Sequence, residues 1–367
     1  MQFLKFLLIP VSWLYGLVIS LRNFCYDKNI FKSRSFSFPV INVGNLTMGG
    51  TGKTPHIEYL IRLLKDTYRI ATLSRGYGRK TQGFMLVSNP SSTAMVGDEP
   101  MQYHLKFPEI TVSVGEDRVA AIENLMKLQP KPETILLDDA YQHRAVKPGL
   151  NILLIEHDAV MKKDYLLPSG TLREWKRGMK RADVIIISKC PEILVPIERK
   201  RLAEHITLLP EQKLFFSFFR YGDIVRLNSK SGNMLIGTNY YFEKRFTILL
   251  VTGIANPSGI AEYLKRKTDK LETIVFRDHH EFTPDDIRTI TETFNNIANA
   301  NKIIVTTEKD AMRLRNPELD EATRALPIFY LPVQVQFHHQ DKEQFDNIVL
   351  NYARQNQTNR FIHQREN

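Results

Sequence analysis

GNLTMGGTGKT, at residues 44–54, is the stretch that decides the class of this chain. The apolar segment FPVINV at 38–43 leads into it, and from Pro55 onward apolar residues recur at helical spacing. A strand, a glycine-rich turn and a helix that starts with Gly-Lys-Thr form the context in which a phosphate-binding loop works. Backbone N–H groups of such a loop point at phosphate oxygens, and the helix N-terminus adds partial positive charge. The sequence therefore predicts that the chain binds a nucleoside triphosphate.

The end of this loop supplies the expected nucleotide contacts, which are Gly49, Gly50, Thr51, Gly52, Lys53 and Thr54. Lys53 would reach the β- and γ-phosphates, and the Thr54 hydroxyl would bind Mg²⁺. Thr47 departs from the general motif G-x-x-x-x-G-K-[ST], which has glycine at that position. The alternative interpretation is a glycine-rich turn without a ligand. Three loop glycines, the lysine and the flanking elements together favour the nucleotide site.

Length and composition limit the remaining possibilities. The 367 residues are too many for one ordinary core and predict two domains. A net charge of +10 favours an anionic partner, such as nucleic acid, an anionic membrane surface or a phosphorylated substrate. No nucleic-acid module is recognisable, so nucleic acid is the least favoured of the three. Cys25 and Cys190 are far apart, which argues against a disulfide framework and suits a reducing cytoplasm.

Residues 6–21 form an apolar run without a single charge. A membrane-spanning helix needs roughly 20 apolar residues, and this run is shorter and interrupted by proline and glycine. A secretory signal is also disfavoured, because only one lysine precedes the run and no small-x-small cleavage site follows it. We expect residues 1–28 to form a membrane-associated interfacial helix, with Trp13 and Tyr15 at headgroup depth. The alternative is an apolar helix packed on the chain's own core.

The rest of the chain predicts an α/β fold of the P-loop NTPase type. Strands alternate with helical patterns over residues 29–222, which indicates a doubly wound, mainly parallel sheet. Its strands are expected at 38–43, 69–74, 134–137, 151–155 and 184–188. After a hairpin-like linker at 223–239 we expect a second, smaller α/β domain at 240–350. A polar C-terminal tail at 351–367 completes the chain.

A predicted buried strand at 134–137 ends in Asp138 and Asp139, which is the pattern of a Walker B motif. Phosphate-loop enzymes use an acid at a neighbouring strand end to hold Mg²⁺. Adjacent residues leave a strand end in different directions, so one would serve the metal and the other a second, catalytic task. We assign Asp138 to the metal and Asp139 to the second task, an order that the sequence leaves open. On its own the pattern is often only a strand before a turn.

Three other loops carry residues that suit phosphoryl transfer. Asp98, in a Gly-Asp-Glu-Pro turn, could accept the proton of an acceptor hydroxyl, or could simply lie in a solvated turn. Arg173 could steady γ-phosphate charge, or could form a surface ion pair. His279 and His280 follow a predicted strand and could bind metal, orient a base or cap a helix.

Taken in order, these segments resemble the tetraacyldisaccharide 4′-kinases, the lipid A 4′-kinases of Gram-negative bacteria. The resemblance runs from the apolar N-terminus to about residue 333 and rests on eight motifs: GNLTMGGTGKTP at 44–55, SRGYG at 74–78, GDEP at 97–100, DDAYQH at 138–143, LPSGTLRE at 167–174, GIANP at 253–257, DH at 278–279 and TEKD at 307–310. The family's own loop diverges at the position of Thr47. Ala140, Ser169 and Thr171 depart from the family pattern, but none of them replaces a charged group.

The resemblance implies a kinase that moves the γ-phosphate of ATP onto the 4′-hydroxyl of tetraacyldisaccharide 1-phosphate in lipid A and lipopolysaccharide biosynthesis. It implies Asp98 as the proton acceptor, supported by His279. Arg173 and Glu174 match the family's Arg-Glu pair, and we place Glu174 at the metal with Thr54 and Asp138. ATP and Mg²⁺ are the expected cofactors.

A lipid acceptor implies that the enzyme works at a membrane. We expect a peripheral or monotopic protein on the cytoplasmic face of the inner membrane of a Gram-negative bacterium. Basic residues near the N-terminal helix would favour both anionic lipid and the 1-phosphate of the acylated glucosamine disaccharide. No nucleic acid and no protein partner is implied. Asp98 and His279 lie in different halves of the chain, so we expect the active site between two domains that close on each other.

Two rival functions remain at this point. The first is another phosphate-loop GTPase or ATPase that acts as a switch, although Ser188-Lys189-Cys190 lacks the asparagine and aspartate of a guanine-binding Asn-Lys-x-Asp. The second is a membrane-bound scaffold with a decaying nucleotide site. The second is disfavoured because Lys53, Thr54, Asp138 and Asp139 are all intact.

Overall fold

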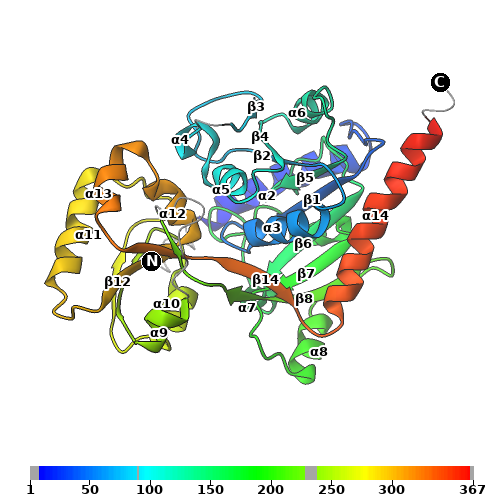
Figure 1. Ribbon diagram of the computed structural model, residues 1–367. Coiled ribbons are helices and arrows are strands. Elements are labelled where there is room, and N and C mark those ends of the chain that lie inside the picture. Colours follow the sequence, from blue (N-terminus) through cyan, green and yellow to red (C-terminus); the bar gives the residue numbers. More distant parts are fainter. Residues whose placement is uncertain (1–7, 89–90, 228–237, 364–367) are drawn as a thin grey trace.

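The computed structural model describes residues 8–88, 91–227 and 238–363. The first two residues of the apolar run, residues 228–237 of the expected linker and the last four residues of the expected tail lie outside these ranges. The described chain forms two α/β units, each built on its own sheet, which lie side by side (Figure 1).

The first unit contains a nine-stranded sheet in the order β14-β8-β7-β6-β1-β5-β2-β4-β3. The strands are β1 (Val40–Asn45), β2 (Ile70–Ser74), β3 (Met85–Leu86), β4 (Thr111–Val114), β5 (Thr134–Asp138), β6 (Leu150–Glu156), β7 (Val184–Ser188), β8 (Lys213–Tyr221) and β14 (Val333–Phe337). The seven strands from β8 to β4 are parallel, and only β3 and β14 at the two edges are antiparallel. The expected doubly wound, mainly parallel sheet is therefore confirmed.

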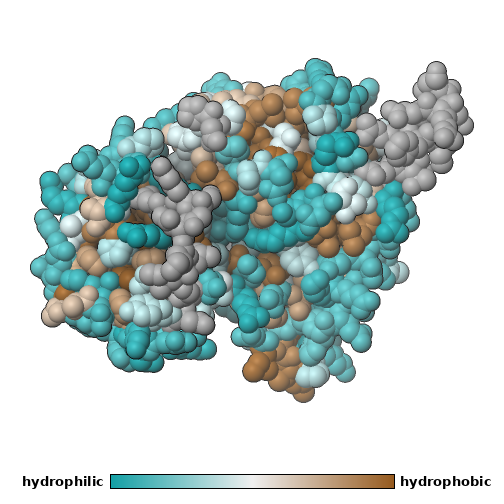
Figure 2. Space-filling view, viewed as in Figure 1, coloured by the Kyte–Doolittle hydropathy of each residue, from teal (hydrophilic) through white to brown (hydrophobic). Residues whose placement is uncertain are grey.

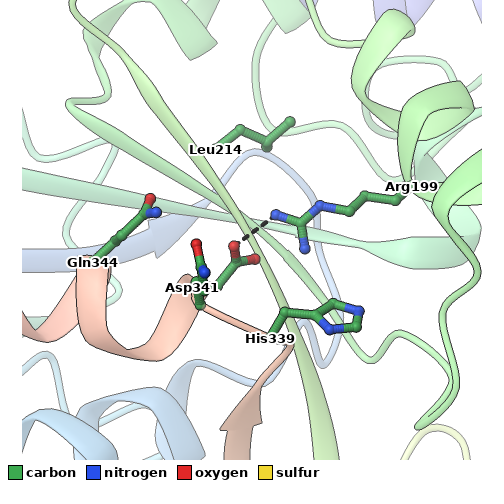
Figure 3. Close-up of a pocket in the computed structure, with 6 residues that line it drawn as sticks. Arg199, Leu214, His339, Asp341 and Gln344 are labelled. Carbon is green, nitrogen blue, oxygen red and sulfur yellow. Dashed lines mark hydrogen bonds and ion pairs between the residues drawn. The ribbon is translucent and has the colours of Figure 1, made fainter.

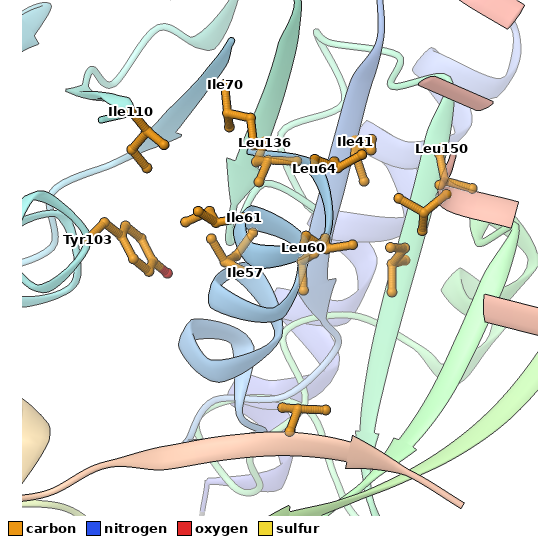
Figure 4. Close-up of a cluster of buried hydrophobic side chains, with 14 of the residues drawn as sticks. Ile41, Ile57, Leu60, Ile61, Leu64, Ile70, Tyr103, Ile110, Leu136 and Leu150 are labelled. Carbon is orange, nitrogen blue, oxygen red and sulfur yellow. The ribbon is translucent and has the colours of Figure 1, made fainter. Parts of the chain in front are cut away.

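Helices cover both faces of this sheet, as parallel strands require. The helical elements of the first unit are α2 (Ile9–Asp27), α3 (Lys53–Leu64), α4 (Thr93–Val96), α5 (Asp98–Lys106), α6 (Arg118–Leu125), α7 (His157–Val160), η1 (Lys176–Arg181), α8 (Pro196–Glu204) and α14 (Asp341–His363). On one face α3 packs Ile57, Leu60, Ile61 and Leu64 against side chains of the central strands, such as Leu136 (Figure 4). Fully burying each such side chain contributes about 1.5–3 kcal/mol. This packing fixes the start of α3, and with it the phosphate loop.

The second unit contains a five-stranded sheet in the order β11-β10-β12-β13-β9. Its elements are β9 (Val225–Arg226), α9 (Thr238–Glu243), β10 (Thr247–Thr252), α10 (Ser258–Lys265), β11 (Leu271–Val275), α11 (Pro284–Asn296), β12 (Lys302–Thr307), α12 (Glu308–Leu314), η2 (Pro317–Leu319), α13 (Asp320–Arg324) and β13 (Ile328–Leu331). Four strands are parallel, and β9 pairs antiparallel to β13 at one edge.

The chain crosses between the units twice, and the two crossings lie side by side. β8 ends at Tyr221 and leads to β9, while β13 leads back to β14, and Gly222 N donates to Pro332 O at 2.9 Å. Figure 1 shows β14 running from the second unit into the first sheet. The second sheet thus begins inside the expected linker at 223–239, and β14 and α14 pack on the first unit although we expected the second domain to extend to 350. A local pattern predicts a strand at β14 but does not specify the sheet to which it adds.

α2 contacts the loops of the first unit through small and polar side chains. The Ser12 hydroxyl donates to Ser169 Oγ at 2.9 Å. The Tyr15 hydroxyl donates to the carbonyl oxygen of Arg173 at 2.8 Å. A helix on the surface of a globular protein usually turns its apolar stripe inward, and α2 does the reverse.

The opposite face of α2 is apolar and exposed, with Val11, Trp13, Leu14, Leu17, Val18, Leu21 and Phe24 at the surface. α2 therefore packs on the chain's own core with one face only, and the core does not cover its apolar face. A second exposed apolar patch, formed by Ile193, Val195 and Ile197, lies where α8 begins, and Figure 2 shows apolar surface there. Within the described ranges, no helix combines the length and the apolar character that crossing a membrane requires.

Candidate active site

The phosphate loop leaves β1 and leads directly into α3. Gly49 and Gly52 have φ angles of +115° and +87°, in the left-handed region that favours glycine. A Cβ on Gly52 would collide with the ring of Phe219, so a side chain at this position would require the ring to move. The Thr51 carbonyl oxygen accepts a hydrogen bond of 2.8 Å from the Ser188 hydroxyl. The loop is thus held in place by β7 and β8 as well as by its own strand.

The first half of the loop pairs with the segment that carries Arg173. Thr47 forms an antiparallel bridge with Leu172, and Met48 N donates to Thr171 O at 2.6 Å. The Arg173 N–H in turn donates to Leu46 O at 2.7 Å. This strand-like pairing explains why threonine replaces glycine at position 47, since an extended residue has no need of positive φ. It also brings the side chain of Arg173 to the phosphate loop.

Lys53, Asp139 and Arg173 meet at the end of the central strands. Arg173 Nη1 donates to both oxygens of Asp139, at 2.9 and 3.0 Å, and Lys53 Nζ lies 3.5 Å from Asp139 Oδ1. Asp139 has a φ of 53°, an uncommon conformation for a residue with a side chain. The structure therefore brings together three of the predicted site residues, with two cations facing one carboxylate.

Asp138 lies beside this group, buried under Tyr103. The Tyr103 hydroxyl donates to Asp138 Oδ2 at 3.1 Å and also interacts with the Thr54 hydroxyl. Burial, and then the negative charges of Glu99 and Asp139, raise the pKa of Asp138 to about 7. A divalent cation between Thr54 and Asp138 would supply the missing positive charge.

These residues suit Mg²⁺. In the described part of the chain no group of three or more His, Cys, Asp or Glu side chains could form a metal cage. Mg²⁺ bound to a nucleotide does not need one, because it keeps waters and phosphate oxygens and takes only one or two protein ligands. The Thr54 hydroxyl and the Asp138 carboxylate fit that requirement.

Glu174, which we placed at the metal, makes its contacts elsewhere. Oε1 accepts from Arg181 Nη2 at 2.7 Å and from Gln142 Nε2 at 3.1 Å, and Oε2 accepts from Asn23 Nδ2 at 3.1 Å. Thr54 and Asp138 are not among its hydrogen-bond partners. Because Asn23 lies on α2, Glu174 connects the N-terminal helix to the loops of the site.

Asp98 and His279 meet where the two units touch. Asp98 begins α5 in the first unit, and His279 follows β11 in the second, with His279 Nδ1 3.3 Å from Asp98 Oδ2. Arg313 of α12 also reaches this carboxylate, and its Nε donates at 2.9 Å. Burial acts to raise the pKa of Asp98, but hydrogen bonds from His279 and Arg313 and nearby positive charge outweigh it, so the pKa is about 2. The expected pairing across two domains is thus present, and its carboxylate is ionised.

Sequence reasoning missed Arg313 and Tyr103. Arg313 lies three residues after Asp310 of the TEKD motif, and its Nη1 donates to Asp310 Oδ1 at 2.9 Å. Helical spacing could have indicated that pair, but not its contact with Asp98. Nothing in the local pattern marks Tyr103, which reaches Asp138 only through tertiary packing.

Cavities at the described surface of the first unit include two of similar size. One of about 560 Å³ is lined by Glu116 and by residues 75–79 and 81–83, and the Tyr77 ring from this loop lies 5.2 Å from the His279 ring. The other, of about 540 Å³, lies at an ion pair of 2.6 Å between Arg199 and Asp341 (Figure 3). Only the first cavity adjoins the predicted site.

Comparison with known proteins gives consistent results. The sequence model of the family described as tetraacyldisaccharide-1-P 4′-kinase matches residues 4–354. A tetraacyldisaccharide 4′-kinase of Bacteroides thetaiotaomicron is 44% identical over 366 residues, which cover 98% of this chain and 96% of that protein. The protein of the same name from Flavobacterium johnsoniae is 43% identical over 357 residues, with 97% and 99% covered.

A solved structure agrees with these sequence matches. The crystal structure described as the "apo" form of LpxK from Aquifex aeolicus in complex with ATP superposes with a TM-score of 0.72. That chain is 29% identical in sequence, and the match covers 95% of this chain and 99% of the other.

Replacing Tyr103 with phenylalanine tests the assignment of the cation site. The change removes the hydroxyl that orients Asp138 and Thr54, so we expect the Mg²⁺ concentration for half-maximal nucleotide binding to rise roughly tenfold. Titrating Mg²⁺ at fixed ATP measures this. Tyr59→Phe is the matched control, because the Tyr59 hydroxyl donates to Asp346 instead. Equal Mg²⁺ dependence in the two variants would contradict the assignment.

Proposed function

Since this chain belongs to the tetraacyldisaccharide 4′-kinase family, we propose that its active site lies at the junction of the two units, between the phosphate loop and Asp98. The chain is an ATP-dependent kinase that transfers the γ-phosphate to the 4′-hydroxyl of tetraacyldisaccharide 1-phosphate in lipid A biosynthesis. The rival interpretations as a nucleotide switch or a scaffold are therefore set aside. The observation that carries the proposal is that Asp98 and His279, from separate units, meet in one ion-pair network.

The first unit would hold the nucleotide. Lys53 and Arg173 are the cations nearest to where a γ-phosphate would lie, and Asp139 already keeps both in place. Thr54 and Asp138 would hold Mg²⁺. The ion that they would hold would supply positive charge, which would offset the negative charge that develops during transfer.

Asp98 would receive the acceptor hydroxyl. A carboxylate with a pKa of about 2 is a weak base, but phosphoryl transfer through a loose transition state needs little base strength. Asp98 would therefore orient the hydroxyl first and take its proton late in the transfer. The cavity beside Tyr77, with Arg75 and Arg79 in its lining, is where we place the sugar and phosphate groups of the acceptor.

The lipid chains of the acceptor require contact with a membrane. α2 presents an exposed apolar face that could enter the lipid. Tyr15 of α2 and Leu202 of α8 belong to one hydrophobic cluster. α2 and the apolar patch at α8 therefore lie on the same face of the first sheet. The net charge of +10 favours an anionic lipid surface. We therefore place the protein at the cytoplasmic face of the inner membrane of a Gram-negative bacterium, with α2 in the interface.

Transfer of labelled γ-phosphate in mixed micelles tests the proposed roles. We expect labelled lipid only when tetraacyldisaccharide 1-phosphate is present, and none with Lys53→Ala, which removes the main phosphate contact. Asp98→Ala should lower kcat by about a hundredfold or more, with little change in ATP affinity. A large loss of ATP affinity with normal kcat in Asp98→Ala would contradict the role of Asp98.

Sedimentation with anionic vesicles tests the role of α2. Leu17→Glu should lower the vesicle partition coefficient by about tenfold, because one exposed apolar side chain no longer enters the lipid. Val275→Glu is the matched control, since Val275 is also exposed and apolar but lies on β11 in the second unit. If both variants bind vesicles as the wild type does, α2 is not the membrane contact.

A further inference from the structure

The Asp98 carboxylate is held by one oxygen only. Arg313 donates to Oδ2 through both Nε and Nη2, and His279 Nδ1 also lies nearest to Oδ2. Among the described residues, every hydrogen bond and ion pair to this side chain ends on Oδ2. Oδ1 is left for a group that enters the site.

The Arg313 guanidinium is itself fixed from the second unit. Nη1 donates to Asp310 Oδ1 at 2.9 Å and to Gly253 O at 3.1 Å. Asp310 is fully buried and accepts from Gly253 N and from the Thr307 hydroxyl. The planar fork of Arg313 therefore has a single orientation, and it transmits that orientation to Asp98.

Contacts at both ring nitrogens hold His279 in place. Lys309 Nζ lies 3.2 Å from His279 Nε2, and Nζ also pairs with Glu99 at 2.8 Å. His279 Nδ1 lies 3.2 Å from Arg313 Nη2 and 3.3 Å from Asp98 Oδ2. His279 Nδ1 is therefore next to the same Asp98 oxygen that Arg313 holds. His279 and Arg313 thus act on the same atom from two elements of the second unit.

We propose that Arg313 is a positioning residue, which holds Asp98 Oδ2 so that Oδ1 faces the acceptor hydroxyl. The inference rests on the proposed function, in which Asp98 receives that hydroxyl. In this arrangement the second unit supplies the Arg313 guanidinium, which orients Asp98. Arg313 does not itself contact the substrate.

The charged and titratable groups around Asp98 determine the pH dependence. They are Glu99 on α5, Tyr77 on the 75–83 loop, His279 after β11, and Lys309, Asp310 and Arg313 on α12. Burial raises the pKa of Asp98 and the Arg313 charge lowers it. Removing that charge therefore raises the pKa from about 2. Activity needs ionised Asp98. The pH below which activity is lost therefore moves to a higher value in a variant that lacks the charge.

Two variants separate charge from orientation. Arg313→Met removes both the charge and the planar fork, so we expect kcat at pH 7.5 to fall about tenfold or more. Below pH 6 we expect a further loss of kcat. The KM for ATP should change little. Arg313→Lys keeps the charge but lacks the fork, so we expect it to restore the acid side of the kcat profile and only part of kcat. Wild-type kcat and wild-type pH profiles in both variants would overturn the inference.

A double-mutant cycle separates positioning from structural support. In an Asp98→Asn background, Arg313→Met should cause little further loss of kcat, because no carboxylate remains to be positioned. Lys106→Met is the matched control, since Lys106 joins the same two helices by pairing with Glu308 but does not contact Asp98. Its effect should be equal in both backgrounds. An Arg313→Met effect that adds fully to Asp98→Asn would overturn the inference.

The same assay distinguishes this inference from the proposed function. If Asp98→Asn alone keeps wild-type kcat, the role of Asp98 fails, and with it the proposed function of the junction. If Asp98→Asn is impaired while Arg313 variants are not, only the positioning role fails. Should Arg313→Met not fold, as judged by its thermal unfolding, Arg313→Lys in both backgrounds gives the same comparison.

Discussion

The ion pair between Asp98 and Arg313 is the interaction on which the assembled site depends. Asp98 belongs to the first sheet unit and Arg313 to the second, and two parallel contacts, Glu99 with Lys309 and Lys106 with Glu308, join the same pair of helices. The two adjacent chain crossings near Tyr221 and Pro332 allow the units to meet in this way. At this junction His279 of the second unit comes next to a carboxylate of the unit that carries the phosphate loop.

The surroundings of two buried carboxylates in this site shift their pKa values in opposite directions. Burial and the negative charges of Glu99 and Asp139 raise the pKa of Asp138 to about 7, although Tyr103 and Ser74 donate to its carboxylate. Asp98 is also buried, but a guanidinium and an imidazole hold its charge, and its pKa falls to about 2. When the pKa values of two carboxyl groups differ in this way, the two groups can take different roles in one site. Asp138 suits a cation that completes its charge, and Asp98 suits a hydroxyl that needs orienting.

The sequence predicted those parts that local physics determines. Strand, glycine turn and helix specify the phosphate loop, and a buried strand that ends in acids specifies the Asp138 region. Local patterns could not show that Arg313 contacts Asp98, nor that β14 joins the first sheet, since tertiary packing decides both. Glu174 shows the same limit, because its partners come from α2 and from distant loops. The assigned roles of the site residues remain predictions.

A structure of the protein with tetraacyldisaccharide 1-phosphate and a non-hydrolysable ATP analogue would show directly which Asp98 oxygen receives the acceptor. The decisive measurement is the distance from each Asp98 oxygen to the 4′-hydroxyl of the acceptor. We expect Oδ1 to lie within hydrogen-bond distance of that hydroxyl, while Arg313 stays on Oδ2 and the γ-phosphate lies between Lys53 and Arg173. A 4′-hydroxyl bound by another residue, with Asp98 still enclosed by the second unit, would contradict this expectation.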